Sequence, residues 1–424
     1  MAAIITERKT KPVNQSAILF NAASVRKWTT LIPGRNLFHV LAEHTAMLLH
    51  FAMVVALFEN AVAWGIPQWA FFPISVYGVI ISGILIHRIA LLGHESSHYL
   101  LAKDRKWNDL LADVLCFFPI WSNLTNYRRK HLGHHLHPNE AGKDPNLSSD
   151  RAEALFKSFP MKRPSSIFRY YALFFWPPFV LGNLVDIFKV LVVGPKRASA
   201  EEPAIKPPLR ERINPGFVGV LYIIALFGVL TWAKHINEPV IMIGLPLLFH
   251  LVVGLGGVML IPDSVLQRSG GKINYNKRLS AALRLTFGAT ILIGATWVRE
   301  YFDFHFGFYY FWFWLFPLLY VLPYLMLLRE VYQHANLGTG TIDNSRIIHA
   351  DPFTRWALLP FGNDYHLIHH IYPNIPHYHL RAAHLDLLDQ SEDYRNGLTE
   401  VEGNVKSSGE LLSVSESLAS LSAK

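Results

Sequence analysis

Cysteine is nearly absent from the sequence, which has one, Cys116, in 424 residues. A single cysteine excludes an intrachain disulfide, and it excludes a zinc or iron–sulfur site built from several thiolates of this chain. Any metal site within the chain must therefore use nitrogen and oxygen ligands.

Charged residues are also scarce, at 17% against roughly 25% in ordinary soluble domains, while 51% of the residues are hydrophobic. A helix that crosses a membrane needs about 20 mostly apolar residues. Six stretches have this character, and each predicts a spanning helix: 40–63, 69–92, 216–233, 240–261, 281–298 and 304–328. The predicted fold class is an all-α integral membrane protein with about six transmembrane helices in three hairpins, interfacial or re-entrant helices and a cytosolic histidine-rich cap.

The net charge of +8 comes from basic residues scattered through the loops that flank these stretches. A nucleic-acid site would gather such residues on one face, whereas loops rich in Lys and Arg are typical of the cytosolic side of a membrane protein. No nucleic-acid partner is therefore expected. Residues 1–38 show no cleavable signal and are predicted to be a cytosolic segment.

The stretch 171–193 has basic loops on both sides, so we expect it to dip into the membrane or lie flat rather than cross it. Four crossings then follow it, which keeps the later histidine-rich part on the cytosolic face. Residues 39–388 are predicted to form one membrane domain. Residues 389–424, which are rich in serine and glutamate, are predicted to be a disordered tail.

Three histidine clusters each lie beyond a long apolar stretch. They are His94-Glu95-Ser96-Ser97-His98, His131-Leu132-Gly133-His134-His135 and His366-Leu367-Ile368-His369-His370. On a helix, residues three and four apart share one face, so each cluster can direct two or three imidazoles at one point. His334, directly past the last predicted span, can join them.

The eight cluster histidines and His334 are too many for one zinc ion, which takes three or four protein ligands. Two six-coordinate ions that share a bridging oxygen could use about nine nitrogens, so the count predicts a dinuclear metal centre. Imidazole suits iron, copper, nickel and zinc, so the ligand type alone does not name the metal.

Several charged residues near the clusters have two interpretations. Four acidic residues could orient ligand imidazoles through hydrogen bonds, or they could have ordinary roles in helices and loop caps. These are Glu95, Glu330, Asp144 and Asp364. Arg128, Arg129 and Lys130 are expected either to meet an acidic head group or electron carrier, or to anchor the chain at the membrane surface.

Two other classes of protein stay open on the residues alone. The first cluster, with Glu95 between His94 and His98, also matches the two-histidine zinc signature in which glutamate is the general base of a hydrolase. That interpretation leaves the other two clusters without a role. A membrane protein that binds metal without catalysis is the second alternative, which ionisable residues paired at mid-membrane would favour.

Taken together, the three clusters resemble the histidine boxes of the membrane fatty-acid desaturase superfamily, which includes hydroxylases and ketolases as well as desaturases. The stretches 94–109, 127–146 and 363–376 are similar to those of bacterial-type desaturases, and the resemblance covers roughly residues 40–388. One position departs from this branch: Gln333 stands before His334, where glutamate is frequent. Glu330, one helical turn earlier, is the candidate for supplying that carboxylate.

The resemblance implies a centre of two iron ions on the cytosolic face, with O2 as co-substrate. It implies the ligands His94, His98, His131, His134, His135, His334, His366, His369 and His370. The reaction it favours is desaturation of a fatty-acyl or other lipid chain, with hydroxylation, ketone formation or oxidative decarboxylation as alternatives. Because the sequence has no haem domain or glycine-rich dinucleotide motif, the electrons are expected from a separate ferredoxin or from a cytochrome b5-type protein with its reductase.

Overall fold

The computed structural model describes residues 20–179, 181–182, 184–185, 214–268 and 272–420. Within these residues, six helices are long and apolar enough to cross a membrane, in agreement with the prediction. The first is α2 (Arg35–Glu59), the second is α3 (Phe71–Ser97), which follows the short helix η1 (Gln68–Ala70), and the third is α9 (Pro215–Ile236). The fifth is α13 (Lys277–Phe302). The fourth and the sixth each contain a π-helical segment: α10 (Pro239–Phe249), η7 (His250–Leu255) and α11 (Gly256–Leu260), then α14 (Phe306–Tyr310), η8 (Phe311–Leu315) and α15 (Phe316–His334).

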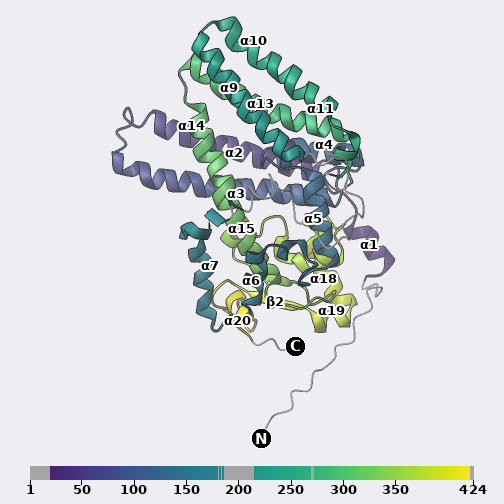
Figure 1. Cartoon of the computed structure of the whole chain (residues 1–424). Coiled ribbons are helices and arrows are strands. Elements are labelled where there is room, and N and C mark those ends of the chain that lie inside the picture. Colours follow the sequence, from purple (N-terminus) through teal and green to yellow (C-terminus); the bar gives the residue numbers. More distant parts are fainter. Residues whose placement is uncertain (1–19, 180, 183, 186–213, 269–271, 421–424) are drawn as a thin grey trace.

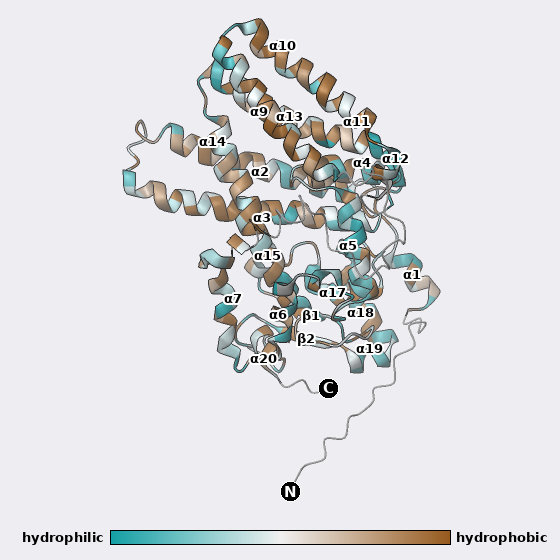
Figure 2. Ribbon diagram, in the orientation of Figure 1, coloured by the Kyte–Doolittle hydropathy of each residue, from teal (hydrophilic) through white to brown (hydrophobic). Residues whose placement is uncertain are grey.

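The long helices form two groups (Figure 1). In the first group, α3 packs against both α2 and α15. In the second, α9 packs against α10 and α13, and the hydroxyl of Tyr222 and the Thr286 side chain both bond the buried His250. Large apolar side chains such as Phe38, Leu49 and Leu260 are well exposed on these helices, and Figure 2 shows that brown, hydrophobic residues dominate them. A surface of this kind is expected where a helix faces lipid.

Helices α3 and α15 approach one another closely at Gly83. A Cβ atom added to Gly83 would lie 2.3 Å from the Cβ atom of Val321 on α15. Small residues permit such close approach between membrane helices. This contact matters for the site because α3 carries the first histidine cluster and α15 ends at His334.

A hydrophilic cap lies below the long helices in Figures 1 and 2. Its first part contains α1 (Ala22–Trp28), α5 (Leu124–Leu136), η3 (Pro145–Leu147), α6 (Asp150–Lys157) and η4 (Pro164–Ile167). Helices α4 (Arg105–Ala112) and α12 (Asp263–Arg268) lie beside the ends of the long helices, and η2 (Asp113–Phe117) follows α4 directly. Later parts of the cap are β1 (Arg346–His349), α16 (Pro352–Ala357), η9 (Asn363–Tyr365), α17 (His366–Ile371), η10 (His377–His379) and α18 (Leu380–Gln390). The last are α19 (Glu392–Gly397), β2 (Thr399–Glu402) and α20 (Val414–Ala419).

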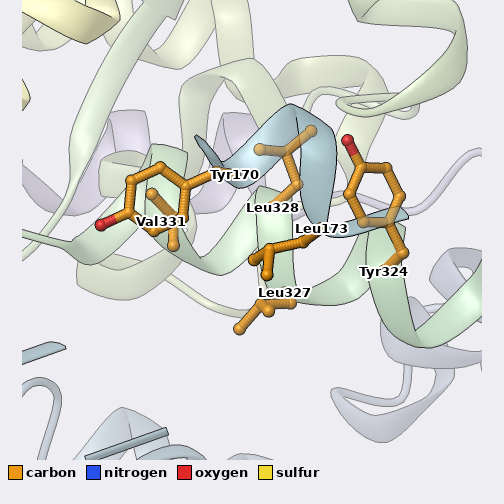
Figure 3. Close-up of a pocket in the computed structure, with 6 residues that line it drawn as sticks. All are labelled: Tyr170, Leu173, Tyr324, Leu327, Leu328 and Val331. Atoms are coloured by element: carbon orange, nitrogen blue, oxygen red, sulfur yellow. The ribbon is translucent and has the colours of Figure 1, made fainter. Parts of the chain in front are cut away.

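The stretch 171–193 begins in α7 (Phe168–Ala172) and η5 (Leu173–Phe175), and its residues 180, 183 and 186–193 lie outside the described part. The described beginning runs along α15. Tyr171 and Tyr332 share a hydrogen bond of 2.5 Å between their hydroxyls, and Tyr320 donates to the carbonyl of Phe174. An apolar crevice between the two elements is lined by Tyr170, Leu173, Tyr324, Leu327, Leu328 and Val331 (Figure 3).

The predicted disordered tail from residue 389 is corrected by the structure, in which residues 389–420 are folded onto the cap. Strand β2 pairs in parallel with β1, from Arg346 opposite Thr399 to His349 opposite Glu402. Val414 and Leu418 of α20 are fully buried. The polar composition misled the prediction because a few buried apolar residues, backbone pairing and hydrogen bonds of buried serines suffice to hold this segment.

Candidate metal centre

The nine histidines singled out in the sequence come together in two groups of potential metal ligands. The first group contains His94, His98, His131, His135 and His369, and the second contains His134, His334, His366 and His370. Within each group the donor atoms lie within 4.8 Å of one another. All of the named histidines are buried or half-buried.

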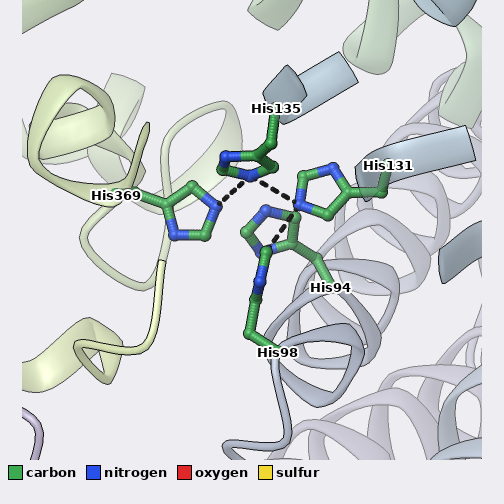
Figure 4. A group of neighbouring side chains, drawn as sticks. All are labelled: His94, His98, His131, His135 and His369. Carbon is green, nitrogen blue, oxygen red and sulfur yellow. Dashed lines mark hydrogen bonds between the residues drawn. The ribbon is translucent and has the colours of Figure 1, made fainter. Parts of the chain in front are cut away.

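The first group joins three elements that are remote in sequence (Figure 4). His94, in the last turn of α3, and His98, which caps it, come from the first cluster. The Nε2 atom of His131 on α5 lies 2.8 Å from that of His98 and 3.0 Å from that of His135. His369 on α17 completes the group, with its Nε2 3.1 Å from Nε2 of His135.

The second group is built in the same way around the end of α15. Nε2 of His334 lies 3.3 Å from Nε2 of His134 and 3.0 Å from Nε2 of His366. His370 follows, with its Nε2 3.1 Å from Nε2 of His366. His334 was expected just past the last helix, and it is in fact the final residue of α15.

The two groups adjoin because the second and third clusters contribute to both. On α5, His131 and His135 face the first group while His134 faces the second. On α17, His369 faces the first group and His366 and His370 face the second. The rings of His135 and His370 stack across the boundary with their centroids 4.3 Å apart. Two ions, one in each group, would therefore be neighbours.

The spacing of the nitrogens fits metal coordination. Two imidazole nitrogens bound at right angles on one ion, each about 2.1 Å from it, would lie about 3.0 Å apart. Moreover, His134 donates from Nδ1 to Asp144 at 2.9 Å and His334 donates from Nδ1 to the carbonyl of Asn344 at 2.9 Å. In their neutral forms both rings then present bare Nε2 lone pairs to one another, an arrangement that a cation between them would stabilise.

Unpartnered nitrogens give the same indication. Both ring nitrogens of His94 are buried and have no hydrogen-bond partner within the described part of the chain. Buried polar atoms are normally paired, so an orphaned imidazole aimed into a cluster of imidazoles is expected where a metal ion binds. The donor set of neutral nitrogens fits the borderline transition metals better than Mg²⁺ or Ca²⁺, which prefer oxygen.

Burial keeps most of these imidazoles neutral. It lowers the pKa of His98 to about 3, with a smaller contribution from the charge of Arg128. Burial is likewise the main cause that holds the pKa well below 6.5 for His131, His135, His366, His369 and His370. Burial also lowers the pKa of His134, but the hydrogen bond to Asp144 and nearby carboxylates outweigh it, so that this pKa is raised. Neutral imidazole is the form that binds metals.

The four acidic residues proposed to orient these rings have different surroundings. Asp144 contacts His134 directly with both carboxylate oxygens, at 3.0 and 2.9 Å. Glu95 accepts a hydrogen bond from the backbone N–H of His377 and lies 3.7 Å from Nδ1 of His94. Glu330 accepts from the side chain of Asn146, and Asp364 accepts from Arg355. Of the four, Asp144 alone hydrogen-bonds a cluster histidine within the described residues.

Gln333 and Arg128 have structural partners that the sequence did not suggest. Gln333 donates at 2.8 Å to the carbonyl of Asn363, three residues before the third cluster, and it belongs to neither histidine group. The surface interpretation of Arg128 is wrong, because its side chain is only 2% exposed and pairs with Asp109 at 2.6 Å. The same arginine also donates to the carbonyls of Ser96 and Ser97, so it ties α5 to the end of α3.

Sequence reasoning missed Asp109 and Asp113 on either side of the α4–η2 junction. Asp109 accepts hydrogen bonds from Arg128 and from the backbone and side chain of Asn274. Asp113 accepts from Tyr275 at 2.5 Å and from the backbone N–H of Leu124, just before the second cluster. The signal in the sequence was Asp113, a carboxylate within the apolar run 110–118, where a charge requires a partner.

Comparison with known proteins gives two findings. The model of the family described as "Fatty acid desaturase" matches residues 67–261 and 245–401. A protein of Bradyrhizobium elkanii named "Dihydrorhizobitoxine desaturase" is 26% identical over 125 residues, which are 29% of this chain and 33% of that protein. The matched region thus spans about a third of the relative's length.

Proposed function

The chain belongs to the fatty acid desaturase family, and from this premise we propose that it is a membrane-bound, O2-dependent oxidoreductase that desaturates a fatty-acyl or other lipid chain at a centre of two iron ions. The observation that carries the proposal is the division of nine imidazoles into two adjoining groups. Such a ligand count suits two ions, and neutral imidazole suits iron among other transition metals.

Neutral ligands explain why such a centre would attack an unactivated C–H bond. Nine imidazoles add no negative charge, so the ions they hold remain electron-poor. Iron bound there would supply the redox chemistry that reduces O2 and oxidises the substrate. Removal of two hydrogens from adjacent carbons forms a C=C bond and releases two electrons and two protons. Full reduction of O2 to two waters consumes four of each, so two further electrons and protons must come from elsewhere.

The chain's own residues position the ligands and exclude water. Asp144 and the carbonyl of Asn344 fix the Nδ1–H tautomers of His134 and His334, which leaves Nε2 of each ring to the metal. Six of the nine ligands are only 1–8% exposed, so bulk water has little access to most of them: His94, His131, His134, His334, His366 and His369.

Orientation and electron supply follow from the same proposal. We infer that the cap faces the cytosol, because the basic loops flank it and Lys and Arg favour that side. Because the sequence contains no haem or dinucleotide motif, the two further electrons are expected from a separate ferredoxin or cytochrome b5-type donor with its reductase. Purified chain that oxidised NAD(P)H with substrate by itself would contradict this part.

Two observations favour desaturation over the alternatives. Glu95 lies 3.7 Å from Nδ1 of His94, but its carboxylate already accepts a hydrogen bond from the backbone N–H of His377, which disfavours it as the general base of a zinc hydrolase. The name of the B. elkanii relative describes a desaturase, and the family model carries the same description. Hydroxylation on the same centre differs only in the fate of the oxidised carbon, and analysis of the products separates the two.

The test is expression of the chain in a host of defined lipid composition, followed by metal analysis of the purified protein and mass spectrometry of the lipids. We expect about two iron ions per chain and products 2 Da lighter than their precursors. His369→Ala should abolish the products, because it removes a ligand of the first group. His235→Ala, at an exposed position on α9, is the matched control and should leave them unchanged. Stoichiometric zinc without iron after iron-replete growth would refute the proposal.

A further inference from the structure

A buried arginine closes the end of the helix that carries His334. Arg346, the first residue of β1, is fully buried. Its guanidinium donates to the carbonyl of Tyr332 at 3.1 Å and to that of Ala335 at 2.6 Å. These carbonyls belong to the last turn and the cap of α15, whose final residue is His334. A cation at this position compensates the unsatisfied carbonyls and the negative end of the helix dipole.

The third side of the guanidinium faces the C-terminal helix α20. Nε of Arg346 donates to the hydroxyl of Ser417 at 3.0 Å. No carboxylate pairs with Arg346 among the residues that the structure describes, and burial lowers its pKa to about 9. A buried charge without an ion partner is unfavourable unless hydrogen bonds replace its hydration. The hydrogen-bond acceptors that replace this hydration belong to the end of α15 and to α20, so both helices depend on the side chain of Arg346.

Helix α20 has independent contacts with the chain that leaves α15. The side chain of Asn336 donates to the carbonyls of Ser417 and Ser420, at 3.0 Å each. Asn336 itself has a φ of 62°, which asparagine tolerates better than most residues. Leu418 of α20 packs in the same hydrophobic cluster as Val331 and Tyr332 of α15. The exit of the chain from α15 is therefore fixed from the side of α20 as well.

Helix α20 is also well formed and anchored elsewhere. Ser413 and Glu416 make a capping box at its N-terminus, with hydrogen bonds of 3.2 and 2.7 Å. The carbonyl of Leu418 accepts a hydrogen bond from the backbone N–H of Met161 at 2.8 Å. The match to the family model ends at residue 401, so α20 lies outside the part of the chain that the family describes.

We propose that Arg346 and α20 form a clamp that positions His334, so that loading of the second histidine group depends on the C-terminal segment. The proposal rests on the proposed function, because it takes the second group as a metal site. Arg346 is a positioning residue in this scheme, since its guanidinium bonds Tyr332, Ala335 and Ser417 and, among the described residues, none of the nine rings. The first group has no ligand on α15, so it should depend much less on the clamp.

The experiment compares wild-type protein with Arg346→Met, Arg346→Lys, Ser417→Ala and a chain lacking residues 413–424. Iron per chain should fall from about two toward about one in Arg346→Met and in the truncated chain. Arg346→Lys should be intermediate, because one ammonium cannot match the planar fork of the guanidinium. Ser408→Ala is the matched control, since Ser408 is exposed and bonds Glu402 away from α15. It should retain full iron.

Hydrogen exchange on metal-free protein separates this inference from the proposed function. In the Arg346→Met, truncated and Ser417→Ala chains, we expect faster exchange at residues 328–336 and unchanged exchange at residues 89–98 of the first group. Ser417→Ala removes a single hydroxyl and keeps the test valid if the larger changes prevent folding. Unchanged exchange at 328–336 in folded variants would overturn the clamp. Wild-type protein without iron would instead refute the proposed function, while the exchange data would still decide the clamp.

Discussion

Replacing Gly83 with alanine should disturb the metal centre from a distance. The added Cβ would lie 2.3 Å from both Cβ and Cγ1 of Val321, whereas ordinary contacts begin near 3.4 Å. Helices α3 and α15 must then separate by about 1 Å at this point. Overpacking of this kind costs about 1–3 kcal/mol, against a gain of up to about 1 kcal/mol from helix propensity.

The separation would be transmitted along both helices to their ligands. His94 lies eleven residues beyond Gly83, which is about 16 Å along a helix, and His334 lies thirteen residues beyond Val321. Metal sites tolerate deviations of about 0.2 Å in ligand distance. A shift of even half an ångström between the ends of α3 and α15 should therefore lower iron content as well as thermal stability.

The assay is thermal unfolding in detergent together with iron per chain. We expect Gly83→Ala to lower both, and Gly228→Ala on α9, where an added Cβ meets no atom within 4 Å, to lower neither. Adding Val321→Gly to Gly83→Ala should restore both quantities, because it moves the small residue to the other helix. Val321→Ala should restore little, since its own Cβ remains in the clash. Wild-type stability and iron content in Gly83→Ala would refute the reasoning.

Two further predictions concern single contacts. Asp144→Asn should reduce the affinity for iron by about 10- to 100-fold, because an amide orients the ring of His134 less well than the carboxylate does. Equilibrium titration with iron measures this affinity, and an unchanged value would count against the role of Asp144. Glu400 Oε1 lies 3.1 Å from Nε2 of His384 and 3.8 Å from Nε2 of His349. The proximity of these imidazoles lowers the pKa of Glu400 to about 2, and the Glu400 carboxylate raises the pKa of His349 above 6.5. Because the pKa of His349 is raised on folding, protonation of His349 stabilises the folded protein below pH 6.5, and this stabilisation is lost as the pH rises through the folded-state pKa of His349. Because the pKa of Glu400 is lowered, ionisation of Glu400 stabilises the folded protein above pH 4.5, and this stabilisation is lost as the pH falls toward 2. The protection of the backbone amides of residues 399–402 from hydrogen exchange, corrected for intrinsic exchange rates, should thus decline from pH 6 to pH 8 in the wild type but not in Glu400→Gln. The same pH dependence in both proteins would contradict the role given to His349 and Glu400.

The apolar helices and the histidine pattern could be predicted from the sequence because both are strong local signals. The spans required only length and composition, and the clusters required only helical spacing. The end of α3 was placed too early, at residue 92 instead of Ser97. Hydropathy registers burial in lipid, whereas the last turn of α3, with His94 and Glu95, is buried by the protein itself.

The errors concern contacts between distant segments. Arg128 was read as a surface residue because its neighbours Arg129 and Lys130 are basic and exposed, and nothing local reveals its partner Asp109, 19 residues earlier. The position of Asp364 next to the third cluster left two interpretations open, orienting a ring or capping a loop, and its carboxylate accepts from Arg355 and from no cluster histidine within the described residues. Composition predicted disorder for the tail because pairing between β1 and β2 depends on strands some 50 residues apart.

The bundle of α9, α10 and α13 contributes none of the nine rings. Its connection to the centre runs instead through Asn274 and Tyr275, which bond Asp109 and Asp113 beside the second cluster. The bundle and the metal centre are therefore structurally separable. The sequences of the three helices can diverge without the loss of a ligand, as long as the contacts of Asp109 and Asp113 with Asn274 and Tyr275 are retained. Chimeras that exchange the bundle between relatives should therefore keep their metal.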